Sequence, residues 1–94
     1  MTKNVKSSRS VPKAVLGAQI RAARALLRWS VADLVRESGV SHSTIQRAEA
    51  VDGKSAMTLA NSSAIRRALE AAEVELLDEN GEGPGARLRK RVEN

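Results

Sequence analysis

The 94-residue sequence has no cysteine and only one histidine, His42. These absences exclude a disulfide framework and a thiolate-ligated metal site, and a lone histidine supplies no set of metal ligands. We therefore expect no metal and no cofactor. A chain without cysteine also agrees with a reducing cytoplasm, which is the location that we predict.

Aromatic residues are nearly missing as well. The chain has one tryptophan and neither tyrosine nor phenylalanine, although 41% of its residues are hydrophobic. The core must therefore be built from alanine, leucine, isoleucine and valine. Alanine and leucine are strong helix formers, and the length fits one small domain. The composition predicts a mainly α-helical domain.

Long hydrophobic runs and catalytic patterns are also absent. No 18 apolar residues follow one another and the N-terminus has no signal-peptide pattern, so we expect neither a membrane partner nor secretion. The sequence offers no nucleophile with an attendant base and no carboxylate pair at a recognisable spacing. We therefore expect a soluble protein that is not an enzyme.

Positive charge is concentrated in the first half of the chain. Overall, 16 Lys and Arg residues against 11 Asp and Glu residues give a net charge of +5. Residues 1–47 hold nine basic and two acidic residues, whereas residues 48–83 hold three basic and eight acidic ones. This asymmetry indicates a face that meets a polyanion, with nucleic acid as the commonest candidate. Ordinary solubilising charge is the alternative.

The pattern divides the chain into three parts. Residues 1–13 predict a flexible basic arm, residues 14–73 a helical domain, and residues 74–94 a β-hairpin with a tail. In the helical part, a first helix is expected over residues 15–28, with Arg21 and Arg28 on its exposed face. Its apolar positions recur at steps of three and four residues: Val15, Leu16, Ile20, Ala23, Leu26 and Leu27.

Two short helices follow, separated by a tight turn at Gly39. Ser30 suits the N-cap of a helix that ends near Glu37, and Ser41 suits the N-cap of a helix over residues 42–50. Gly39 ends the first of them because glycine readily adopts the left-handed conformation. The residues expected on the inner faces are Ala32, Leu34 and Val35, then Thr44, Ile45 and Ala48.

A longer helix and the hairpin complete the chain. Thr58 suits the N-cap of the fourth helix, whose expected apolar positions are Leu59, Ile65, Ala68, Leu69 and Ala72. In the hairpin, one register places Glu75 opposite Arg87 and Val74 opposite Leu88, so that charge and hydrophobicity agree. The Gly-rich residues 81–85 between the strands predict a turn. An isolated hairpin is marginal, so it should pack on its own helices or on a second copy of the chain.

Two short helices joined by a tight glycine turn are typical of the helix-turn-helix motif. Gly39-Val40-Ser41, Thr44-Ile45 and Glu49 lie at spacings that resemble the XRE family, which includes the lambda and 434 repressors and Cro. The resemblance covers roughly residues 15–72. It implies a lambda-repressor-like bundle of four to five helices that regulates transcription, most often as a repressor that binds a palindromic operator as a dimer.

The resemblance also implies roles for individual residues. Base contacts fall to four residues at the start and outer face of the second short helix: His42, Ser43, Gln46 and Arg47. Arginine suits guanine and glutamine suits adenine in the major groove. Phosphate contacts, which fix register without reading sequence, fall to Ser30, Ser41 and Thr44. Arg24 and Glu49 occupy the positions of a structural ion pair. Independently of the resemblance, Trp29 lies between the first two expected helices and is expected to close the core or the hinge.

The chain departs from the family pattern at three positions. Val31 stands where relatives commonly have a DNA-contacting glutamine, Ser62 where they usually bury a leucine, and Val51 where a glycine often ends the recognition helix. The missing glutamine at position 31, the acidic stretch from Glu70 to Glu82 and the added hairpin favour an alternative, a protein-binding module such as an antitoxin or antiactivator. We expect a homodimer formed by the segment after Ala72, with a monomer whose hairpin folds back as the alternative.

Overall fold

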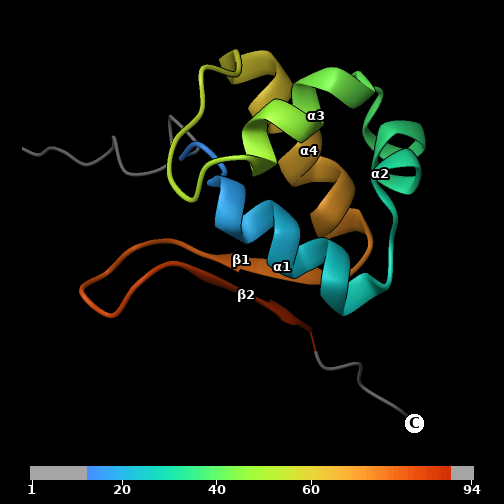
Figure 1. Ribbon diagram of the computed structural model, residues 1–94. Helices are drawn as coiled ribbons and strands as arrows, with labels where there is room; N and C mark the ends of the chain where they lie inside the picture. Colours follow the sequence, from blue (N-terminus) through green and yellow to red (C-terminus); the bar gives the residue numbers. More distant parts are fainter. Residues whose placement is uncertain (1–12, 90–94) are drawn as a thin grey trace, which may run out of the picture.

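The computed structural model describes residues 13–89. The expected basic arm therefore lies outside the described residues except for Lys13, and so do residues 90–94 of the tail. Four helices are followed by an antiparallel hairpin (Figure 1), with the bounds α1 Gly17–Leu27, α2 Val31–Ser38, α3 His42–Glu49, α4 Leu59–Ala71, β1 Val74–Leu77 and β2 Gly85–Leu88. The fold is mainly α, as the composition predicts. Within residues 13–89, no helix is long and apolar enough to cross a membrane.

The core is aliphatic. One large side chain from each of α1, α2 and α3 is completely buried, namely Ile20, Leu34 and Ile45, and α4 adds Ile65 and Leu69. Trp29 is half-buried against this cluster. Small domains need such dense packing because their core is small compared with their surface.

Three residues expected to be buried are exposed. Ala32 is on the solvent side of α2, Leu26 is 39% exposed and Leu59 is 56% exposed. The expected burial of these residues is therefore wrong. In a helix of only two turns, the faces are set by what the neighbouring helices cover: Val31, rather than Ala32, packs against the core.

The predicted helix ends are confirmed by their hydrogen bonds. The hydroxyls of Ser30, Ser41 and Thr58 each accept the amide proton three residues later, as N-caps do. Gly39 ends α2 with φ +77°, a conformation that costs glycine little. The turn into α3 is closed by Ser38, whose Oγ donates to the Leu34 carbonyl and accepts from the Val40 amide.

The start of α1 lies directly against the chain that follows α3. The Gly17 amide donates to the Gly53 carbonyl and the Ala18 amide donates to the Asp52 carbonyl, both at 3.0 Å. A Cβ on Gly17 would lie 1.8 Å from the Val51 carbonyl oxygen, so only glycine permits this approach. Two of the amides that lack partners within α1 are thereby satisfied, and the start of α1 is held against the chain that follows α3.

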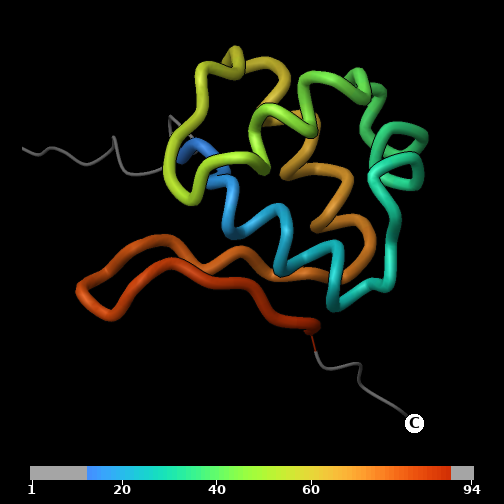
Figure 2. Tube along the Cα trace, viewed as in Figure 1, coloured from blue at the N-terminus to red at the C-terminus, as the bar shows by residue number. Residues whose placement is uncertain are grey.

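The hairpin has the predicted register, with Glu75 opposite Arg87 and Val74 opposite Leu88. It runs along α1, on the side away from α3 (Figure 2). Gln19 of α1 joins the two layers: its side chain is 2% exposed, and its Nε2 donates to the Leu77 carbonyl at 2.9 Å and the Gly85 carbonyl at 3.1 Å. The hairpin therefore packs on its own chain.

Candidate nucleic-acid interface

The outer surface of α3 collects the four residues expected to contact bases. His42, Ser43, Gln46 and Arg47 are all exposed. Because His42 and Gln46, like Ser43 and Arg47, are four residues apart on a helix, they form two adjacent rows on one surface. None of their side chains makes a hydrogen bond or ion pair within residues 13–89, so their polar groups are available to a partner. We call these four residues the α3 face.

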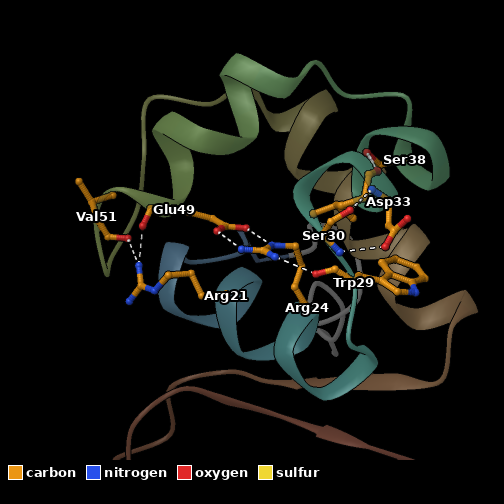
Figure 3. A network of polar contacts seen from close by, with 9 residues as sticks. Arg21, Arg24, Trp29, Ser30, Asp33, Ser38, Glu49 and Val51 are labelled. Carbon is orange, nitrogen blue, oxygen red and sulfur yellow. Dashed lines mark hydrogen bonds and ion pairs between the residues drawn. The ribbon is translucent and has the colours of Figure 1, made fainter.

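The one carboxylate of α3 is turned away from this face. Glu49 accepts two hydrogen bonds from Arg24 of α1, Nε to Oε2 and Nη2 to Oε1, both at 2.7 Å (Figure 3). The two side chains are only 10% and 21% exposed. Hydrogen bonding to Glu49 raises the pKa of Arg24. Arg47 is consequently the only charge of α3 that is presented outward.

Arg24 also fixes the link between α1 and α2. Its Nη1 donates to the carbonyl of Trp29 at 2.8 Å, just before the N-cap Ser30. One guanidinium thus binds the end of α3 and the start of α2 (Figure 3). The planar group has five N–H donors in a fixed arrangement, which lysine could not replace. The relative placement of the two short helices therefore depends on Arg24.

Arg21 closes the C-terminus of α3, a role that the sequence analysis missed. Its Nη1 donates to the carbonyls of Glu49 at 2.6 Å and Val51 at 3.2 Å, and its Nη2 pairs with the Asp52 carboxylate. A cation at this end stabilises the helix dipole and the unpaired carbonyls. Arg21 was expected to be exposed, but its contacts hold it half-buried. The available signal was the spacing of Arg21 and Arg24, since residues three apart on a helix lie on the same face and Arg24 was expected to contact α3.

The three hydroxyls expected to contact phosphate differ in whether their proton is free to form a further hydrogen bond. Ser41 Oγ donates to Thr44 Oγ1 at 2.8 Å, so its proton is already used. Thr44 only accepts in this pair, and Ser30 only accepts from the Asp33 amide. Because phosphate oxygens accept hydrogen bonds, Thr44 and Ser30 are the better suited donors, while Ser41 is first of all an N-cap.

A hollow of about 590 Å³ opens beside α3. It is bounded by the end of α3, the connection after it and the start of α4. No carboxylate lines it, and its polar lining consists of Thr44, Arg47, Lys54, Ser55, Thr58 and Asn61. Hydroxyl, amide and cationic groups of this kind are donors for anionic oxygens.

Potential metal ligands are not clustered in the part of the chain that the structure describes. Within residues 13–89, no group of three or more His, Asp and Glu side chains could hold a metal ion.

Comparisons of the chain with protein-family models, with curated proteins and with solved structures found no match. The functional argument therefore depends on the geometry and the residues of this chain.

Proposed function

We propose that this protein is a sequence-specific DNA-binding regulator of transcription, most simply a repressor, of the helix-turn-helix kind that the XRE resemblance suggests. The observation that carries the proposal is the α3 face. An eight-residue helix, braced from behind by Arg21 and Arg24, presents His42, Ser43, Gln46 and Arg47 outward and its carboxylate inward. A helix of this kind can enter the major groove of B-DNA.

The proposed roles follow from chemistry. Arg47 can donate two hydrogen bonds to guanine O6 and N7, and Gln46 can pair with adenine, each worth about 1–3 kcal/mol of discrimination. Thr44 and Ser30 have hydroxyl protons for phosphate. His42 and Ser43, at the first turn of α3, extend the base-reading row. One such helix reads few base pairs, so we propose binding as a homodimer to two half-sites about 34 Å apart.

The test is selection of bound duplexes from a random library, followed by titration of the selected duplex at two salt concentrations. Arg47→Ala should lower the affinity at least tenfold and relax the preference at one base pair, because a bidentate contact is lost. Arg67→Ala is the matched control: it also removes one exposed arginine, but from α4. Equal affinities of wild type and Arg47→Ala would overturn the proposal.

A second candidate function, a protein-binding module such as an antitoxin or antiactivator, is favoured by one observation. Leu88 at the end of β2 is 48% exposed, and α1 has the exposed Leu26. Apolar side chains left on the surface at a sheet edge suit a protein partner. If no duplex is enriched while Leu88→Glu abolishes a stoichiometric protein complex, this second function replaces the first.

A further inference from the structure

We propose that the hollow beside α3 binds a small aliphatic carboxylate, and that this ligand releases the protein from DNA because it occupies Arg47. Binding of the ligand concerns the free protein and depends only on the lining of the hollow. Release from DNA rests on the proposed function, to which it adds a regulatory ligand of a stated chemical class.

The hollow is large enough for a small molecule. It lies where the connection after α3 returns to the start of α4 (Figure 1), and its volume is about 590 Å³. Pockets that bind small molecules measure about 300–1,000 Å³. One phosphate group of a DNA backbone, equal to a few water volumes of about 30 Å³ each, would fill only a small part of it. The space therefore suits a ligand that has a body as well as a charged group.

Part of the lining is apolar. Ala48 is 1% exposed, Met57 is half-buried against the core, and Val51 is 43% exposed. Ala50 and Ala56 add two methyl groups. None of the described residues that line the hollow is aromatic, so a nucleobase or an aromatic ligand would find no ring to stack on. An aliphatic chain fits this surface, and the flexible methionine can adapt to its shape.

The polar part of the lining consists of hydrogen-bond donors. The side chains of Arg47 and Lys54 make no hydrogen bond or ion pair within residues 13–89, and no acidic residue of this range lines the hollow. Thr58 Oγ1 accepts the Asn61 amide proton at 3.1 Å, so its own proton is free to be donated. Uncompensated positive charge favours an anion, and the planar guanidinium matches the two oxygens of a carboxylate.

Arg47 belongs both to the α3 face and to the lining of the hollow. A guanidinium that binds a carboxylate in the hollow cannot at the same time donate two hydrogen bonds to guanine. Ligand and DNA therefore compete, and each lowers the affinity of the protein for the other. At ten times its own dissociation constant, a competing ligand weakens the binding of the duplex about tenfold.

The first experiment titrates sodium octanoate into the free protein and follows the backbone amides by NMR. The amides of residues 48–58 should shift most. Acetate has the carboxylate without the chain, and octanol has the chain without the charge, so both should bind at least about tenfold more weakly. Each CH₂ group of the chain that becomes buried contributes up to about fourfold in affinity. Equal binding of acetate or octanol, shifts confined to other residues, or no binding would overturn the proposal.

Two pairs of variants locate the ligand. Val51→Ser makes the apolar lining polar but keeps the backbone carbonyl that Arg21 binds, and it should weaken octanoate binding about threefold or more. Leu59→Ser is its control, because Leu59 is 56% exposed and does not line the hollow. Lys54→Gln should likewise weaken binding, whereas Arg67→Gln, which removes a charge outside the hollow, should not. Equal effects within either pair would contradict the site.

The second experiment adds the selected duplex. Octanoate should weaken duplex binding by the wild type, and Val51→Ser should bind the duplex normally but require about threefold more octanoate for release. If octanoate binds in the hollow without changing the affinity for the duplex, the proposed regulation is wrong although DNA binding stands. If no duplex is selected, DNA binding fails as a function, while the titration of the free protein still decides whether the hollow is a carboxylate site.

Discussion

Arg24 and Glu49 join the first helix to the end of the third by two hydrogen bonds of 2.7 Å each. The pair does more than link two helices. It holds the carboxylate of Glu49 away from the α3 face, which we propose contacts DNA. Arg24 also makes a third hydrogen bond, to the Trp29 carbonyl. The electrostatics of the α3 face and the placement of α2 thus depend on the same contact.

We predict that Glu49→Gln destabilises the domain by about 2–4 kcal/mol, because the largely buried Arg24 charge loses its partner. Urea unfolding monitored by circular dichroism measures the change. Glu75→Gln is the matched control, since Glu75 pairs with Arg87 on the exposed surface of the hairpin and should contribute no more than about 1 kcal/mol. Equal losses in both variants would contradict the burial of the Arg24–Glu49 pair.

Gly17→Ala should destabilise the fold by about 1–3 kcal/mol or more, because the new methyl group meets backbone that cannot rotate away. The Cβ would lie 1.8 Å from the Val51 oxygen and 2.3 Å from the Ala48 oxygen. Thermal unfolding of the variant provides the measurement. Gly53→Ala is the control, since a Cβ there meets nothing within 4 Å, and a comparable loss at Gly53 would show that the close approach is not the cause.

Gln19→Leu should destabilise the domain by about 1–3 kcal/mol, because two carbonyls of the hairpin lose their donor while the volume stays similar. Hydrogen exchange of the β1 and β2 amides should increase more than that of α4. Gln46→Leu, on the exposed α3 face, should leave stability almost unchanged. Undiminished protection of the hairpin in Gln19→Leu would mean that apolar packing alone holds it on α1.

Asp33 makes stability depend on pH. The Ser30 amide and then Arg36 hydrogen-bond its carboxylate and lower its pKa below the ordinary 3.8. Because the folded pKa is the lower one, the stabilisation is present above pH 3.8 and is lost as the pH falls through the folded pKa. The stability difference between wild type and Asp33→Asn should therefore shrink on acidification below that value. A difference that is constant into strong acid would contradict this.

Local sequence signals predicted the parts of the fold that depend on near neighbours. Ser30, Ser41 and Thr58 cap helices through amides three residues away, and the hairpin register follows from alternating charge and hydrophobicity within fifteen residues. Ala32 was placed wrongly because a two-turn helix has too few positions to define its buried side. Its orientation is set by contacts with other helices.

Two of the contacts that sequence reasoning missed join residues that are far apart in the sequence. The amide of Gln19 spans 58 and 66 positions to reach two carbonyls, and Ser62 meets an amide 47 positions away. A polar side chain on an apolar helix face indicates that it has a hydrogen-bond partner, but it does not indicate which one. The partners of Gln19 and Ser62 are backbone groups, which every residue has, so the sequence does not identify them. The four residues of the α3 face could be named beforehand because exposure on a helix follows its period.

The Gln19 side chain has a consequence for how the molecule opens. Its two amide protons bind two strands, while its oxygen accepts the Leu16 amide at the start of α1. Lifting either strand therefore breaks a bond to the same side chain that also caps the helix. The hairpin and the first turn of α1 should thus unfold as one cooperative unit, with a single free energy of local opening rather than by fraying strand after strand.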